Sequence, residues 1–162
     1  MLRFRLAACL FLFGVSLAWG EDLRLPAPGP KDTCPVCGMF VALHPDWTAT
    51  VLYKDAHAHH FDGAKDLFKY LHELARYAPG HRQEDIAAIA VTEYYELRRI
   101  DARQAFYVIG SDVRGPMGHE LVPLATREDA EEFLRDHRGR RILTFKEVTR
   151  EVPHNLDRRK FD

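Results

Sequence analysis

The sequence predicts an α+β fold built from two tandem strand–strand–helix–strand repeats that pack as one compact unit. Each half of the chain has a stretch of helical periodicity that follows two short strand-like segments, and a further apolar strand follows each helix. A hydrophobic content of 46% over 162 residues is sufficient for one compact core. We place the first repeat at residues 34–100 and the second at residues 101–150.

The elements of the first repeat follow from hydrophobic periodicity. In chain order we predict a strand at residues 49–53, a second strand that opens at His59, a helix at residues 64–78 and a strand at residues 86–94. The apolar residues of the helix recur at intervals of three and four. Asp62 is a candidate N-cap for this helix, because its short side chain can accept a hydrogen bond from the first turn.

The second repeat has the same order of elements. We predict strands at residues 105–110 and 121–125, a helix at residues 127–137 and a final strand at residues 141–145. Pro123 has no N–H to donate to a neighbouring strand, so its strand is expected at a sheet edge. Thr126 is expected to cap the helix, and Asp129 has the spacing that completes a capping box.

The first 20 residues have the pattern of a signal peptide. Arg3 and Arg5 precede a short apolar segment, and small residues lie before a cleavage site after Gly20. The apolar segment is shorter than a bilayer span. Cys9 lies inside this segment, too early to be the lipidated residue after cleavage. We therefore expect an exported, cleaved protein without a lipid anchor.

Two further segments lie outside the repeats. Residues 21–33 are rich in proline and polar groups and are predicted to be a flexible tether, and residues 151–162 are predicted to be a charged, frayed tail. The formal net charge of −1 argues against a nucleic-acid partner, because such proteins present a strongly basic surface.

The segment Cys34-Pro35-Val36-Cys37-Gly38-Met39 is the principal candidate for chemistry. Proline restricts the turn between the two thiols, and glycine allows the chain to fold tightly after the second thiol. Two thiolates and a thioether are soft ligands, which suit Cu(I). A disulfide, a zinc half-site and a redox pair are the alternatives for a CxxC sequence alone. Met39 favours copper, because neither zinc binding nor thiol–disulfide exchange requires a methionine.

A second candidate segment joins two predicted strands and includes Gly115-Pro116-Met117-Gly118-His119. Met117 has no apolar neighbours in the sequence, so we expect it to be a further soft ligand, with core packing as the alternative. His119 is a candidate ligand or a surface histidine.

The histidines of His57-Ala58-His59-His60 form another cluster. Strand alternation predicts that His57 and His59 share one face, whereas His60 points the other way and is a candidate to reach the CxxCGM loop. We interpret the cluster as a polar hairpin tip, with a second site for Cu(II) or Zn(II) as the alternative.

Three parts of the sequence have a common resemblance: CPVCGM, AFYVIGSDVRGPMGHEL, and EDAEEFL with GRRILTFKEV. They resemble the NosL family, the accessory proteins of nitrous-oxide reductase. The resemblance runs from about Cys34 to Val148. It implies a NosL-like two-repeat α+β fold, distantly similar to part of organomercury lyase. It also implies a periplasmic protein that binds Cu(I) and delivers copper to the copper–sulfide centre of the reductase. The implied partners are apo nitrous-oxide reductase or its maturation machinery, with transient contact to a membrane complex.

The resemblance also assigns residues. Cys37, Met39 and Met117 match the family's CGM and GxMG motifs, and Cys34 matches an upstream cysteine of many members. The chain departs from the family in two respects: it has no usable lipidation motif, and it has Asp62 where many members have a nearby cysteine. These departures leave open a paralogue that serves another copper enzyme.

Two other classes are alternatives to a binding and delivery protein. The first is an enzyme, either a thiol–disulfide oxidoreductase or a lyase of carbon–mercury bonds. The oxidoreductase needs CxxC at a strand-to-helix junction, but the residues after the motif, 39–43, have strand character. The lyase needs an acid beside two thiols, for which Asp62 is the candidate. The second class is a structural zinc module, in which histidines would have to complete the ligand set.

Overall fold

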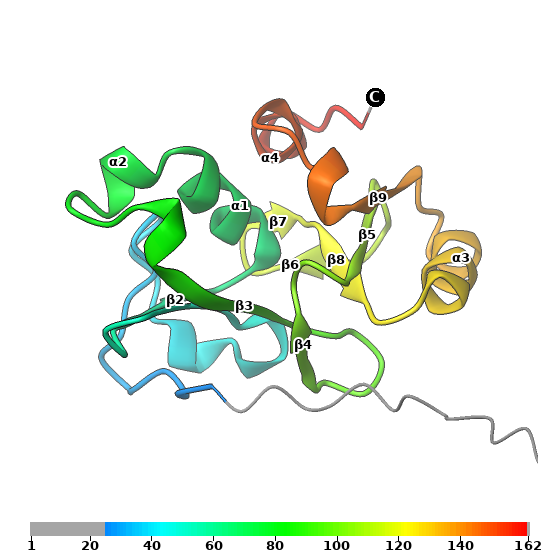
Figure 1. Cartoon of the computed structure of the whole chain (residues 1–162). Coiled ribbons are helices and arrows are strands. Elements are labelled where there is room, and N and C mark those ends of the chain that lie inside the picture. Colours follow the sequence, from blue (N-terminus) through cyan, green and yellow to red (C-terminus); the bar gives the residue numbers. More distant parts are fainter. Residues whose placement is uncertain (1–24, 162) are drawn as a thin grey trace, which may run out of the picture.

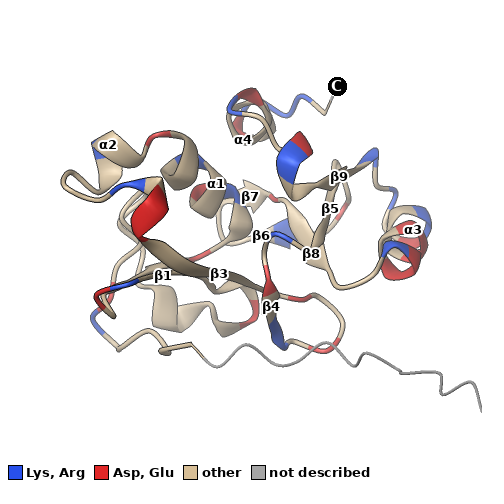
Figure 2. Cartoon of the chain, in the orientation of Figure 1, with Lys and Arg blue, Asp and Glu red and all other residues tan. Residues whose placement is uncertain are grey.

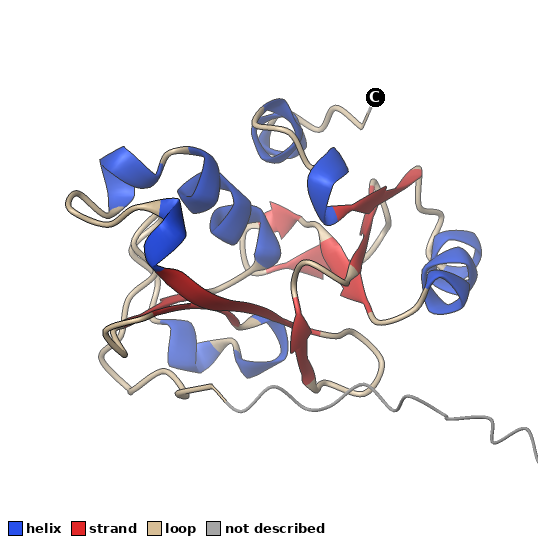
Figure 3. Ribbon diagram, viewed as in Figure 1, coloured by secondary structure: helices blue, strands red, loops and turns tan. Residues whose placement is uncertain are grey.

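Two larger antiparallel sheets, a small two-stranded sheet and the helices that pack on them form residues 25–161, the part of the chain that this computed structural model describes (Figures 1 and 3). The strands are β1 (Ala49–Tyr53), β2 (Ala58–Phe61), β3 (Ile86–Thr92), β4 (Arg99–Asp101), β5 (Phe106–Ile109), β6 (Arg114–Gly115), β7 (Gly118–His119), β8 (Val122–Leu124) and β9 (Arg141–Thr144). The α-helices are α1 (Ala64–His72), α2 (Leu74–Tyr77), α3 (Arg127–Asp136) and α4 (Glu151–Asp157). Short 3-10 helices occupy Val41–Leu43, Pro45–Trp47, Gln83–Asp85 and Phe145–Glu147.

The first sheet has the strand order β2-β1-β3-β4, and every neighbouring pair is antiparallel. β1 therefore lies between β2 and β3, which run parallel to each other on its two sides. The chain connects β2 to β3 through α1 and α2, which lie over one face of this sheet (Figure 1). This arrangement is a split βαβ unit.

The second sheet repeats the pattern with the order β8-β5-β9. β5 takes the central place of β1, and α3 connects the two outer strands. β8 lies at the edge of its sheet, which confirms the expectation from Pro123. Thr126 caps α3 as predicted, because its hydroxyl oxygen accepts a hydrogen bond from the Asp129 amide at 3.0 Å. The α+β fold of two similar units is thus confirmed.

A shared core joins the two units. Alternate residues of β5 point to opposite sides, so Tyr107 and Ile109 pack into the larger core with α1 and the first sheet. Val108 faces the other way, into a smaller core that Phe133 of α3 covers. The second sheet is buried on both faces, which makes the two units one structural body.

The first helical segment differs from the prediction in two respects. It is two helices, because Glu73 leaves the helical conformation with φ −124° and ψ 40°. Its N-cap residue is Gly63, and Asp62 makes no capping bond. Glu120 from the second unit accepts a hydrogen bond from the Lys65 amide at 2.5 Å and so supplies the missing cap.

Short elements account for the other differences. The strand at residues 86–94 ends at Thr92, because Glu93 turns the chain by accepting bonds from the Tyr95 and Glu96 amides. β4 follows this turn and was not predicted. The residues with strand character after the CxxCGM motif instead include a 3-10 helix at Val41–Leu43.

The predicted charged tail is ordered over most of its length. Helix α4 packs against α1, with Leu156 buried, so the expectation of a frayed tail is wrong. Asp157 forms ion pairs with Lys65 at 3.0 Å and with Lys69 at 2.9 Å. These pairs explain why a charged segment docks: its acidic group meets two lysines on the helix beneath it.

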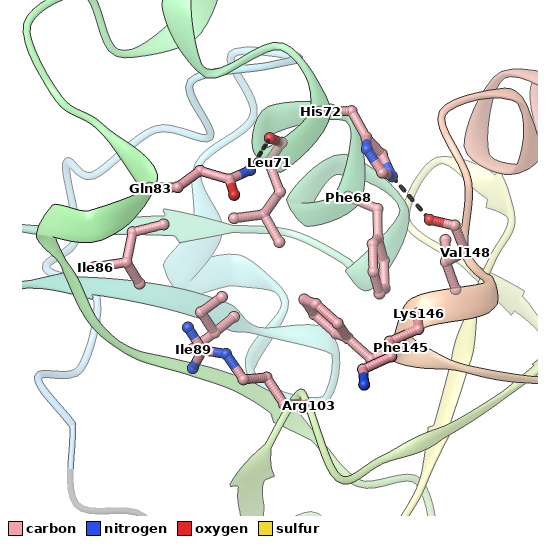
Figure 4. Close-up of a pocket in the computed structure, with 10 residues that line it drawn as sticks. All are labelled: Phe68, Leu71, His72, Gln83, Ile86, Ile89, Arg103, Phe145, Lys146 and Val148. Atoms are coloured by element: carbon pink, nitrogen blue, oxygen red, sulfur yellow. Dashed lines mark hydrogen bonds between the residues drawn. The ribbon is translucent and has the colours of Figure 1, made fainter.

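An apolar pocket of about 310 Å³ lies where the first unit meets the segment after β9 (Figure 4). Its walls include Phe68 of α1, Ile89 of β3 and Phe145, and Arg103 and Lys146 lie among its lining residues. A hydrogen bond of 2.8 Å joins the His72 ring and the Val148 oxygen across the top of the pocket. The pocket belongs to the junction between the units, and its lining contains neither cysteine.

Acidic and basic residues are interspersed on the surface, as α3 illustrates (Figure 2). Within residues 25–161, no helix is long and apolar enough to cross a membrane. The predicted signal peptide, its cleavage after Gly20 and Cys9 lie outside the described residues. Part of the predicted tether is described, and there the Leu25 and Pro26 oxygens accept hydrogen bonds from the Arg99 guanidinium.

Candidate metal centre

The CxxCGM loop forms a tight turn closed by backbone hydrogen bonds. The Cys34 amide donates to the Met39 oxygen at 2.8 Å, and the Gly38 amide donates to the Cys34 oxygen at 2.8 Å. Gly38 has a φ of 80°, a conformation that favours glycine, as the sequence predicted. A bridge between Thr33 and Phe40 closes the base of the turn.

Two aspartates reach this loop from the junction of β2 and α1. Asp62 follows the last residue of β2, and Asp66 lies in the first turn of α1. The Cys37 thiol donates to Asp62 Oδ1 at 3.2 Å, and the Cys34 thiol donates to Asp66 Oδ2 at 3.5 Å. One ligand atom from each of the four side chains lies within 4.8 Å of the others.

Three members of this cluster are buried. Cys34 and Asp62 are each 1% exposed and Asp66 is 2% exposed, whereas Cys37 is half-buried at the rim. Asp62 Oδ2 is buried and has no hydrogen-bond partner among the described residues. Such an atom in a native structure requires an explanation, and an unpaired carboxylate oxygen on a member of this cluster is suited to a metal ion or a proton.

The environment keeps both thiols protonated. Burial, followed by the nearby Asp66 and Asp62 carboxylates, raises the pKa of Cys34. Burial and the hydrogen bonds to Asp62 and Asp66 raise the pKa of Cys37 to about 12. A thioredoxin-type redox pair needs the opposite, a thiol whose pKa is lowered. The electrostatics therefore oppose the oxidoreductase alternative, whereas the strand that the sequence predicts after the motif is not formed.

The donor set can hold a metal in two ways. Zn(II) accepts cysteine sulfur and aspartate oxygen in a four-ligand site. Cu(I) prefers the two sulfurs, and the carboxylates would then accept the protons that the thiols release. Both cysteines are free, so both sulfurs are available as ligands.

The predicted site residues fall into two groups. Cys34, Cys37 and Met39 lie in one loop, where Met39 is half-buried two residues after the second thiol. Met117 lies at the tip of the β6–β7 hairpin and is 43% exposed. His119 is in β7, and its ring centroid is 4.6 Å from that of Phe161. The ligand roles of Met39, Met117 and His119 stay predictions.

The hairpin is attached to α1, the helix of Asp66. The Met117 oxygen accepts a hydrogen bond from Lys65 Nζ at 2.8 Å, and Glu120 accepts one from the Lys65 amide. Glu120 is also buried against Gly63, where an added Cβ would lie 2.4 Å from its carboxylate. The Gly-Pro-Met-Gly segment is therefore anchored to the helix turn that presents the aspartates.

The histidine cluster is separate from the thiols. His57 and His59 share a face, as alternation predicted, and their Nε2 atoms are 3.0 Å apart. Burial and the neighbouring His57 and His81 lower the pKa of His59 to about 4. His60 is buried on the other face, where its Nδ1 lies 2.9 Å from the Thr50 hydroxyl.

Sequence reasoning did not assign Asp62 and Asp66 to a metal site. The sequence indicates Asp62 only as a helix cap and as a candidate acid. The available signal was the position of Asp62, which lies where many members of the family have a nearby cysteine. Asp66 had no such signal, since an aspartate in a first helical turn is ordinary.

A family model described as NosL matches residues 27–153. The chain belongs to the NosL family. It is 28% identical over 150 residues to the copper-binding lipoprotein NosL of Stutzerimonas stutzeri, and the alignment covers 88% of this chain and 78% of that protein.

A solved NosL structure is similar as well. The crystal structure of the copper chaperone NosL from Shewanella denitrificans has a TM-score of 0.66 at 23% identity and covers 79% of this chain and 97% of its own. This match shows the shared fold. The solution structure of apo-NosL from Achromobacter cycloclastes is 27% identical, covers 62% of this chain and 84% of its own, and has a TM-score of 0.42.

Proposed function

We propose that this NosL protein is an exported Cu(I) metallochaperone that delivers copper for assembly of the copper–sulfide centre of nitrous-oxide reductase. The observation that carries the proposal is the convergence of two free cysteines with two buried carboxylates in a turn of the family's CxxCGM sequence. Relatives named as a copper-binding lipoprotein and a copper chaperone support copper as the cargo.

The site suits capture of a soft monovalent ion. Cys34 is the inner ligand, because it is buried, and Cys37 is the outer ligand at the rim. Each thiol must lose its proton to bind copper, and each already donates to a carboxylate that can accept this proton. Lys69 pairs with Asp66 at 3.2 Å and offsets part of the negative charge.

The same geometry suits release. Gly38 is exposed and Met39 is half-buried, so the outer side of the loop is accessible to ligands of a partner. Cu(I) accepts two or three soft ligands without a strong geometric demand, so copper can pass by stepwise exchange of sulfur ligands. In this proposal Met117 supplies a weak thioether ligand from the hairpin, and His119 is a candidate beside it. In this proposal copper only moves from one set of ligands to another, and no covalent bond of a substrate is made or broken. The proposed function is therefore not that of an enzyme.

The proposed location is the periplasm, after cleavage behind Gly20 and without a lipid anchor. The name of the Stutzerimonas stutzeri relative, a lipoprotein, supports export and differs from the unlipidated form proposed here. The mass of the exported protein tests both points, because retention of residues 1–20 or a lipid on Cys9 would contradict them. The proposed partners are apo nitrous-oxide reductase or its maturation machinery, with transient contact to a membrane complex.

Two alternatives have a specific observation in their favour. The Cys₂Asp₂ set satisfies the ligand preferences of Zn(II), which would make the site a structural zinc module. Asp62 also lies beside both thiols, which meets one requirement of a carbon–mercury lyase. The family's copper-binding relatives favour the chaperone over both.

Metal analysis after anaerobic purification separates these functions. The chaperone proposal expects the apo chain to bind one equivalent of Cu(I) in competition with a Cu(I) indicator, and expects Cys37→Ser to abolish this binding. Met117→Leu should weaken binding and leave the stoichiometry unchanged. Tightly held zinc that Cu(I) does not displace would instead identify a zinc module, and unchanged affinity in Met117→Leu would remove that residue from the site.

A further inference from the structure

A second cluster of possible ligands, which includes neither cysteine, lies around the start of β2. We propose that His57, His59 and His81 form a separate site for a borderline divalent metal ion such as Zn(II). Imidazole nitrogen suits Zn(II), Cu(II) and Ni(II), whereas the thiol site suits a soft ion. The proposal assigns a function to residues that the copper site does not use.

The His57 and His59 ring nitrogens lie slightly closer together than two nitrogens bound to one metal ion would lie. Their Nε2 atoms are 3.0 Å apart, and the ring centroids are 4.7 Å apart. Two nitrogens bound to one tetrahedral Zn(II), with Zn–N about 2.0–2.1 Å, would lie roughly 3.3 Å apart. A small opening of the pair therefore admits the ion.

The hydrogen bond at the second ring nitrogen of His59 is also of the kind found at metal-binding histidines. His59 Nδ1 lies 2.5 Å from the Tyr70 hydroxyl, and this hydroxyl is hydrogen-bonded to that of Tyr53. A ligating histidine usually donates its second ring N–H to an acceptor that fixes the ring orientation. Tyr70 is placed to be this acceptor when His59 Nε2 binds the ion.

His81 is the nearest candidate for a third ligand. It follows α2, and its ring stacks on Tyr53 with a centroid distance of 4.0 Å. Its centroid is 5.8 Å from that of His57 and 6.2 Å from that of His59. The His81 ring nitrogens make no hydrogen bond within residues 25–161, so they are available to a metal.

The site is accessible and distinct from the thiols. His57 is exposed, and its amide is held by Asp55 Oδ1 at 3.0 Å, which fixes the end of the turn before β2. Tyr70 lies one helical turn beyond Asp66 on α1, so the two sites are neighbours with different ligand chemistry. A divalent ion bound at the imidazoles would leave the thiols free for Cu(I).

Histidine-ring proton–nitrogen NMR of the full chain, titrated with Zn(II), tests the proposal at the residues concerned. We expect the ring signals of His57 and His59 to move together with one equivalent of Zn(II). His57→Ala, at an exposed position, should weaken this binding at least about tenfold. The matched control His44→Ala, whose ring makes no hydrogen bond in the described part of the chain, should bind as the unaltered chain does. Unmoved His57 and His59 signals, or unchanged affinity in His57→Ala, would overturn the proposal.

A second variant tests the tyrosine support. Tyr70→Phe keeps the ring and removes only the hydroxyl, so the core packing is retained. We expect Zn(II) affinity at the histidines to fall by about tenfold, the usual effect of losing an outer hydrogen-bond partner. Cu(I) affinity at the thiols should be unchanged, which separates this site from the proposed copper site. Equal loss of both metals would show one linked site and contradict the proposal.

Discussion

Asp62 is the carboxylate that contacts the Cys37 thiol and lies in one cluster with both cysteines. Its Oδ1 accepts the Cys37 thiol at 3.2 Å, while its Oδ2 is buried without a partner in the described chain. A buried, unpaired acceptor costs about 1–3 kcal/mol, so the fold retains it at the expense of stability. The proposed role of Asp62 in accepting a thiol proton when metal binds would account for this unpaired atom.

Asp62→Asn should lower the pKa of Cys37. The carboxylate raises this pKa because it favours the protonated thiol, and an amide removes the charge with little change in size. The rate of Cys37 alkylation as a function of pH measures the effect, and its midpoint should move to lower pH. Asp46→Asn, at an exposed position without a hydrogen bond in the described chain, is the control. An unmoved midpoint would show that Asp62 does not act on the thiol.

At the scale of single elements, helix α3 shows what local sequence can determine. Its apolar stripe, its N-cap and its end near His137 are all local features, and all agree with the structure. α1 and α4 show what local sequence cannot determine. The α1 cap comes from Glu120, 55 residues away, and α4 is held by ion pairs from Asp157 to α1. A pattern of nearby residues contains no information on such partners.

Thr126→Ala should destabilise the protein by about 1 kcal/mol. The change removes the hydroxyl that accepts the Asp129 amide and leaves that amide unsatisfied at the helix start. Urea unfolding followed by circular dichroism measures the difference in the free energy of unfolding. Thr126→Ser keeps the hydroxyl and should retain most of the stability. A serine variant as unstable as the alanine variant would show that the loss comes from packing instead.

At the scale of the whole molecule, Glu120 joins the two repeats. It comes from the second unit and accepts hydrogen bonds from the Lys65 amide at 2.5 Å and the Leu121 amide at 2.9 Å. Burial is the main cause that raises its pKa, to about 8. The folded protein therefore holds a proton at this carboxyl in a range where the unfolded chain has released it.

Glu120→Gln should flatten the dependence of stability on pH. Because the folded state binds the extra proton, the free energy of unfolding falls as pH rises from about 5 to about 8, by at most roughly 1.4 kcal/mol per pH unit. Glutamine keeps an oxygen acceptor for the two amides and has no proton to lose. Urea unfolding at several pH values measures the slope, and Glu128→Gln on the exposed side of α3 should leave it unchanged. A slope that persists in Glu120→Gln would contradict the assignment.

The thiol site was partly predictable because some of its residues, like the residues that form a helix or its cap, are close together in the sequence. Cys34, Cys37 and the turn at Gly38 are close in sequence, so spacing alone brings the sulfurs together. Asp62 and Asp66 join them only because β2 and α1 pack beside the loop, a tertiary contact between segments 25 to 32 residues apart. Met117 and His119 lie in a second unit, and local sequence sets no distance from them to the cysteines.

We propose that the two cysteine sulfurs of the CxxCGM loop hold Cu(I). X-ray absorption at the copper edge of the Cu(I)-loaded chain measures the ligands directly. We expect a copper coordination shell dominated by sulfur, which is lost when Cys34 and Cys37 are both changed to serine. A first shell of nitrogen or oxygen alone, or a sulfur shell that persists in the double serine variant, would contradict it.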